Sequence, residues 1–144
     1  DKLASLINEV THQCPANLSV TIESDRIDNE NVHQFYHDNR VDWFMLMSET
    51  EGGVPVSICE AMSHGVPVIA ASSGAIPEIV DSSTGLLLSH DPDDNEFLTA
   101  INRFIGGRET AGTLRVNARE RWRNSFNSQQ LRDSFASEIS QLLP

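Results

Sequence analysis

The chain has 144 residues, 39% of them hydrophobic, which is enough to bury the core of one domain and short for two. Its 10 Lys and Arg against 21 Asp and Glu give a net charge of −11, which argues against nucleic acid and anionic membranes as partners. Cys14 and Cys59 lack the spacing of a metal site or disulfide framework, which favours a cytoplasmic setting, and no apolar run approaches the ~18 residues of a membrane span.

Helical and strand patterns alternate along the first two thirds of the chain, and three helical patterns follow. Apolar residues at helical spacing indicate helices, short apolar or alternating runs indicate strands, and Gly and Pro mark the ends. In chain order the sequence predicts a helix over about 2–13, a strand over 18–24, a helix over 28–39, a strand over 41–47, a helix over 56–65, a strand over 66–72, a helical turn over 75–80, a strand over 84–90, and helices over about 93–106, 109–124 and 128–142.

This alternation predicts an α/β fold, with a Rossmann-like parallel sheet flanked by helices. In such sheets ligands bind beyond the carboxyl ends of the strands. Two loops rich in Gly and Pro follow predicted strands, namely "SETEGGVP" after 41–47 and "SSGAIPE" after 66–72. We therefore expect both loops to lie at one edge of the sheet.

The first of these loops has the features of a phosphate site. Gly52 and Gly53 allow a ligand close to the backbone and permit a positive φ. Pro55 stands where the following helix begins, and the free N–H groups there favour an anion. The residues that we expect to contact a diphosphate are Gly52, Gly53, Val54, Pro55, Val56 and Ser57.

Glu60 lies about one and a half turns into the same helix. Its carboxylate can accept two hydrogen bonds, which suits the vicinal hydroxyls of a ribose. A nucleoside diphosphate carrying a sugar is one occupant that fits this pattern. An ordinary strand–loop–helix joint with a solvated glutamate explains the spacing equally well.

The run "SETEGGVPVSICEAMSHGVPVIAASSGAIPEIV", followed by "TGLLL" and "DP", resembles the donor-binding signature of glycosyltransferase family 4. These are retaining enzymes with the GT-B fold that transfer sugars from nucleotide sugars. The resemblance implies that residues 1–144 are a single domain, the C-terminal, donor-binding half of a GT-B fold, truncated at its N-terminal edge. It further implies a role in the synthesis of cell-surface polysaccharide or glycolipid, with neither metal nor cofactor.

The same resemblance places the acceptor site in an N-terminal lobe outside this sequence. That lobe would also carry any peripheral contact with the inner membrane. We expect the isolated chain to be inactive for this reason. In the family the second glutamate of a Glu-x7-Glu motif holds the donor ribose, which assigns that role to Glu60.

The first glutamate of the family motif lies beside the transferred sugar, and here the sequence departs from the pattern. Counting back from Glu60, the family spacing falls on Gly52, and Glu51 stands one residue further away. One extra residue in the Gly52–Gly53 turn would leave Glu51 as the catalytic glutamate, with Glu49 as the alternative. Other GT-B enzymes, such as a sugar-nucleotide epimerase, and a non-catalytic nucleotide-binding module are the competing functions.

Three further patterns have simple structural interpretations. His33 and His37 are four residues apart on a predicted helix and are expected to form a surface pair. His64 is expected to be a cation at a helix C-terminus. The arginines of the predicted helix over about 109–124 are expected to lie on a solvated face.

Overall fold

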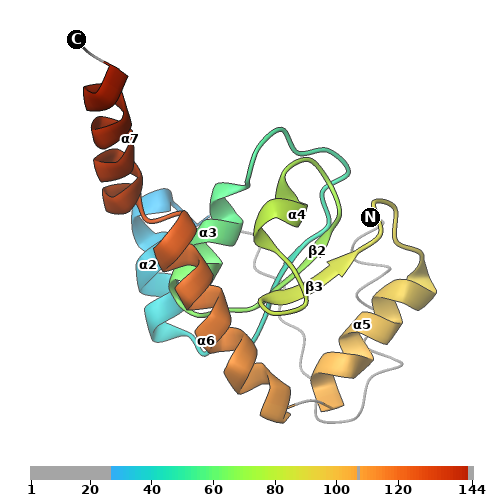
Figure 1. Ribbon diagram of the computed structural model, residues 1–144. Coiled ribbons are helices and arrows are strands. Elements are labelled where there is room, and N and C mark those ends of the chain that lie inside the picture. Colours follow the sequence, from blue (N-terminus) through green and yellow to red (C-terminus); the bar gives the residue numbers. More distant parts are fainter. Residues whose placement is uncertain (1–26, 107, 143–144) are drawn as a thin grey trace.

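The computed structural model describes residues 27–106 and 108–142 (Figure 1). The expected helix over about 2–13 and the strand over 18–24 lie outside these residues, and every other predicted element is confirmed. The elements in chain order are α2 (Asn29–Asp38), β1 (Phe44–Leu46), α3 (Val56–Ser63), β2 (Val68–Ala71), α4 (Ile76–Ile79), β3 (Gly85–Leu88), α5 (Asp94–Gly106), α6 (Arg108–Ser125) and α7 (Ser128–Leu142).

The described strands form a parallel sheet in the order β1-β2-β3. Val68 of β2 pairs with Phe44 of β1 on one side and with Gly85 of β3 on the other. Parallel strands require crossovers, and here α3 connects β1 to β2 while the short α4 connects β2 to β3. The predicted α/β fold with a parallel sheet flanked by helices is therefore confirmed.

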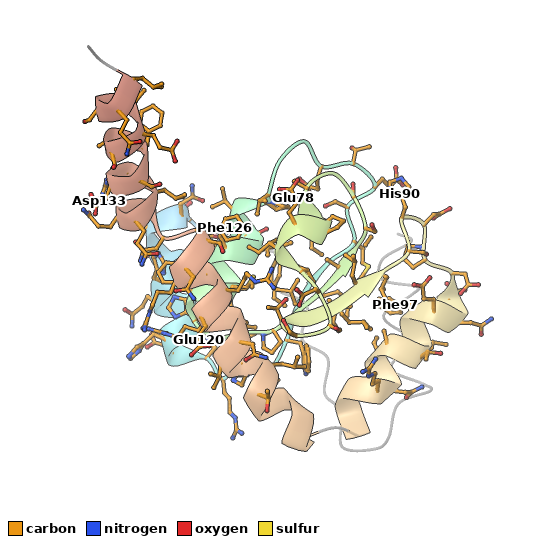
Figure 2. All side chains as sticks on the ribbon, viewed as in Figure 1. Glu78, His90, Phe97, Glu120, Phe126 and Asp133 are labelled. Atoms are coloured by element: carbon orange, nitrogen blue, oxygen red, sulfur yellow. The ribbon has the colours of Figure 1, made fainter. Side chains whose placement is uncertain are left out.

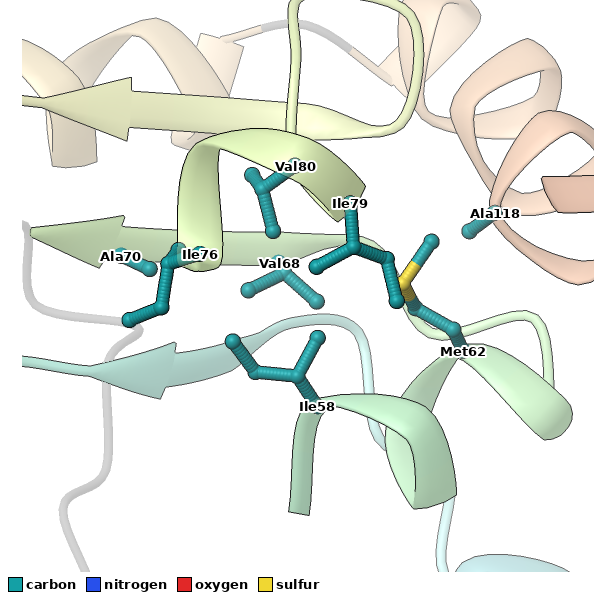
Figure 3. Close-up of a cluster of buried hydrophobic side chains, with 8 residues drawn as sticks. All are labelled: Ile58, Met62, Val68, Ala70, Ile76, Ile79, Val80 and Ala118. Carbon is teal, nitrogen blue, oxygen red and sulfur yellow. The ribbon is translucent and has the colours of Figure 1, made fainter. Parts of the chain in front are cut away.

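Strand β2 is buried along its whole length, and its residues alternate between two hydrophobic clusters. Val68 and Ala70 face a cluster built with α3, α4 and α6, whereas Ile69 faces a second cluster against α5. Figure 1 shows these helices on opposite faces of the sheet. Figure 3 shows the larger cluster, whose buried members are Ile58, Met62, Val68, Ala70, Ile76, Ile79, Val80 and Ala118.

Helix α3 ends in a tight hydrogen-bonded turn at Gly65. The N–H of Gly65 donates to the carbonyl of Met62 at 2.9 Å, and the N–H of Val66 donates to that of Ala61 at 3.0 Å. This pair of bonds requires a left-handed residue just past the helix, and Gly65 has a φ of +67°. The predicted helix end at Gly65 is confirmed.

Helix α6 packs across α3, and its arginines bind the loops around it. The expected solvated face holds for the exposed Arg119 and Arg123, whereas Arg115 and Arg121 are half-buried. Three of these arginines also bond to groups far away in the sequence. The pairs are Arg115 with the carbonyl of Val41, Arg119 with the carbonyl of Ser63, and Arg121 with the carboxylate of Asp81. Arg119 thereby satisfies the last carbonyl of α3, so α6 holds both the start of β1 and the end of α3.

Helix α7 extends away from the sheet, and among the described elements it packs mainly against α6 (Figure 1). None of its residues is buried, and it contributes to neither core cluster. Its exposed apolar side chains are Leu131, Phe135, Ile139 and Leu142. No helix within the described residues is long and apolar enough to span a membrane.

Replacing Gly65 by alanine tests the junction between α3 and α6. A Cβ atom there would lie 3.1 Å from the carbonyl oxygen of Arg115, on a backbone that L-residues rarely adopt. We expect Gly65→Ala to lower the free energy of unfolding by about 1 to 2 kcal/mol in a urea titration. The matched control is Gly112→Ala within α6, where a Cβ atom meets nothing within 4 Å. That control should raise the free energy of unfolding by about 0.5 to 1 kcal/mol, and equal effects of the two variants would contradict the proposed constraint.

Candidate functional site

The loops after β1 and β2 contact each other at the carboxyl edge of the sheet, as expected from the parallel topology. Ser73 donates a hydrogen bond from Oγ to the carbonyl oxygen of Glu49 at 3.2 Å. Gly74, with a φ of +52°, packs so closely that a Cβ atom there would overlap the carbonyl oxygen of Glu51. The backbone of Glu51 therefore has a fixed neighbour in the second loop.

Gly52 and Gly53 form the open part of the first loop. Both are exposed, and a Cβ atom at either position would meet nothing within 4 Å. This leaves room for a ligand to approach the backbone. Neither Gly52 nor Gly53 has a positive φ. Among the described glycines, Gly65 and Gly74 have one.

Helix α3 begins directly after this open turn, with Pro55 as its N-cap residue. The N–H groups of Ile58 and Cys59 both donate to the carbonyl of Pro55. The N–H groups of Val56 and Ser57 have no hydrogen-bond partner among the described residues. Unpaired amides at a helix start attract anions, so this end of α3 can bind a phosphate group.

The first-loop side chains divide between the core and solvent. Val54 is half-buried and packs against the larger core cluster, which anchors the loop just before the helix. The side chain of Val56 is 71% exposed although it is apolar. The amide of Val56 is thus flanked by an apolar side chain that a bound ligand could cover.

Glu60 is half-buried, and its carboxylate accepts no hydrogen bond from any described residue. Burial, together with the negative charge of Glu60, raises the pKa of Tyr36 to about 12. The phenol therefore stays protonated and can still donate a hydrogen bond near this carboxylate. The position of Tyr36 beside Glu60 depends on how α2 packs on α3, which no local pattern in the sequence indicates.

A third group lies at the same edge, on the loop after β3. The exposed His90, labelled in Figure 2, contacts the carbonyl oxygen of Ser72 through Nδ1 at 3.0 Å. Ser72 is the residue that leads from β2 into the second loop. Sequence reasoning found no role for His90, and the available signal was its position just after the strand predicted over 84–90.

The histidines of α2 and α3 form a cluster that matches neither the expected pairing of His33 with His37 nor the expected helix-end cation at His64. His33 does not pair with His37; its Nδ1 lies 2.9 Å from Nε2 of His64, while His37 contacts Asp38. Tyr36 stacks on His64 with ring centroids 5.2 Å apart. Burial lowers the pKa of His64, and the charges of His33, Arg119 and His37 lower it further. His64 is therefore not the stabilised helix-end cation that the sequence suggested.

The fold and the facing strand-end loops define the class of protein, an α/β domain with the architecture of GT-B glycosyltransferases. HepE of Anabaena, solved in complex with UDP and glucose, superposes with a TM-score of 0.70 at 23% identity, over 96% of this chain and 36% of HepE. The family model described as glycosyl transferases group 1 matches residues 7–106. The chain belongs to the glycosyl transferases group 1 family.

Two curated relatives agree with this assignment. WcaL of Salmonella typhimurium, a glycosyltransferase named for colanic acid biosynthesis, is 30% identical over 102 residues, or 67% of this chain and 25% of WcaL. The sulfoquinovosyl transferase SQD2 of Arabidopsis thaliana is 35% identical over 83 residues, or 55% of this chain and 16% of SQD2. The matched region thus spans a quarter or less of these relatives.

The pKa of His64 predicts how stability depends on pH. Because the folded chain disfavours the protonated ring, the unfolded chain binds more protons once the pH falls below the ordinary histidine value of 6.5. The free energy of unfolding should therefore fall as the pH is lowered from about 7 to about 5. His64→Gln should flatten this dependence in urea titrations across that range, whereas the control His90→Gln should keep it, since His90 contacts Ser72 and not the histidines of α2 and α3. A dependence unchanged in His64→Gln would contradict the assignment.

Proposed function

We propose that this chain is the donor-binding lobe of a retaining glycosyltransferase that moves a sugar from a nucleoside diphosphate to an acceptor. Family membership supports transfer of a sugar. The names of WcaL and SQD2, together with the UDP and glucose bound to HepE, support a nucleotide-sugar donor. The WcaL name also makes cell-surface polysaccharide a reasonable class of product.

One observation carries the proposal. Helix α3 presents the unpaired amides of Val56 and Ser57 beneath the open Gly52–Gly53 turn, and the unbonded carboxylate of Glu60 follows on the same helix. The amides suit a diphosphate, and the carboxylate suits the two hydroxyls of a ribose. In this arrangement Gly53 and Val54 add backbone donors, and Pro55 fixes the start of the helix.

In the proposed reaction the bond between the anomeric carbon and the diphosphate breaks, and the acceptor oxygen bonds to that carbon with retention of configuration. The proton of the acceptor hydroxyl passes to the departing diphosphate oxygen. Positive charge develops on the sugar ring as the leaving group departs. A carboxylate beside the ring stabilises this charge more in the transition state than in the ground state. We assign this role to Glu51, whose backbone is held against Gly74.

The proposal divides the reaction between two lobes. Residues 1–144 hold the donor, and the acceptor binds to a lobe outside this sequence. The isolated chain then retains weak affinity for a nucleoside diphosphate without transferring sugar. We place the enzyme in the cytoplasm, where nucleotide sugars would reach it, with any membrane contact made by the other lobe.

Substitution of Glu60 tests the placement of the ribose. A hydrogen bond to a charged, half-buried carboxylate contributes about 1.5 to 3 kcal/mol, so Glu60→Ala in the full-length enzyme should weaken UDP binding about tenfold to a hundredfold. Isothermal titration with UDP and with 2′-deoxy-UDP measures this loss, and the variant should no longer distinguish the two ligands.

The matched control is Glu78→Ala, since Glu78 is exposed and its carboxylate bonds to no described residue. This control should bind UDP like the parent enzyme. Unchanged UDP affinity in Glu60→Ala would show that the nucleotide is placed wrongly. No UDP binding by the parent enzyme would overturn the proposed function itself.

Substitution of the two loop glutamates tests the catalytic assignment. Glu51→Gln in the full-length enzyme should lower kcat by at least about tenfold with little change in donor affinity, because the lost charge acts mainly on the transition state. Glu49→Gln should be nearly silent, since Glu49 is exposed and contacts the second loop through its carbonyl. Initial-rate assays at saturating donor measure both, and the reverse result would transfer the role to Glu49.

A further inference from the structure

The side chain of His90, just after β3, contacts the second loop of the candidate site. This contact is in addition to the backbone contacts of the strand end. We propose that His90 is a positioning residue for the transfer reaction, acting through the loop after β2 on the backbone of Glu51. This inference rests on the proposed function, because it assigns His90 to the donor site of that reaction. His90 itself contacts neither Glu49 nor Glu51 in any hydrogen bond of the described residues.

The bond from His90 has a defined direction. A carbonyl oxygen can only accept, so the Nδ1 atom of His90 carries the proton that it donates to Ser72 across 3.0 Å. Protonation of the ring adds a proton at Nε2 and leaves the Nδ1–H in place. The positioning role therefore works in both charge states of the ring.

The contact reaches Glu51 through three consecutive residues. Ser72 follows β2 directly, and the next residue, Ser73, is only 3% exposed and donates its hydroxyl to the carbonyl of Glu49. Gly74 then packs against the carbonyl of Glu51 with no space for a side chain. Displacement of the Ser72 carbonyl would move this short segment, whose far end is fixed by the fully buried Ile76.

The segment that carries His90 is itself held in place. Glu96 of α5 accepts hydrogen bonds from the backbone N–H of Ser89 at 2.7 Å and from the Ser89 hydroxyl at 2.6 Å. The backbone N–H of Glu96 donates in turn to Asp93 at 2.8 Å. His90 therefore extends from a fixed strand end. The Ser72 N–H already donates to the carbonyls of Leu88 and Ser89, and the His90 bond adds a restraint on the Ser72 carbonyl.

This restraint should matter for turnover more than for donor binding. Most of the groups proposed to bind the nucleotide, namely the amides of Val56 and Ser57 and the carboxylate of Glu60, belong to α3, which the Ser72 bond does not touch. Glu51 is the proposed group whose distance from the reacting carbon depends on the second loop. Loss of the bond should thus lower kcat while leaving affinity for UDP nearly unchanged.

Three variants of the full-length enzyme test the inference. His90→Ala removes the donor, and its kcat should fall about threefold to tenfold, as expected for one neutral hydrogen bond. His90→Asn retains a side-chain N–H near the position of Nδ1 and should restore at least half of the parent kcat. His37→Ala is the matched control, because His37 is an exposed histidine on α2 whose one hydrogen bond within the described part of the chain is to Asp38, and it should be silent.

A second measurement follows the coupling without using catalysis. Hydrogen–deuterium exchange of the amides in residues 48–53 and 72–76 should accelerate in His90→Ala and remain at the parent rate in His37→Ala.

The following outcomes would contradict the inference. Parent-like kcat and exchange in His90→Ala would show that the contact positions nothing. Equal defects in His90→Ala and His90→Asn would show that the imidazole itself is needed rather than the hydrogen bond to Ser72. Failure of the proposed function can be distinguished from these outcomes, because the parent enzyme itself would then show no UDP binding or no sugar transfer. Such a result would also remove the basis of this inference.

Discussion

Because β2 is buried on both faces between two parallel neighbours, helices must cover both sides of the sheet and the connections must cross over it. That requirement brings the ends of β1, β2 and β3 to one edge. The site at that edge is built from main-chain groups held at strand ends, including the Ser73–Glu49 bond and the contact of Gly74 with Glu51. The burial of β2 thus decides where ligand chemistry can occur.

The order and type of the elements were predictable because their signals are local. The apolar run around Val68, the turn at Gly65 and the Gly and Pro of the first loop each act within a few residues. The bonds from Arg119 to Ser63 and from His90 to Ser72 could not be predicted, since each joins residues from different elements. The sequence showed which side chains could donate but not which carbonyl would be within reach.

The proposed site would have to bind an anionic ligand although the chain itself is strongly negative. The chain carries a net charge of −11, and Glu49, Glu51 and Glu60 all belong to the loop and helix that would hold a dianionic diphosphate. Backbone amides attract phosphate through fixed dipoles and cannot lose a proton as the pH changes. The carboxylate of Glu60 on the helix and that of Glu51 on the loop would then serve the ribose hydroxyl groups and a developing positive charge.

The contacts of the second loop also bear on the conformational entropy of binding. Its start is held by His90, its middle by Glu49 and Glu51, and its end by the buried Ile76. In the first loop, Gly52 and Gly53 lack such neighbours. Fixing a residue costs about 1 to 2 kcal/mol, so ordering this two-residue turn would cost about 2 to 4 kcal/mol. Most of the conformational entropy lost on binding would therefore come from the turn that leads into the proposed phosphate-binding amides. The rest of the site would already be ordered before the ligand binds.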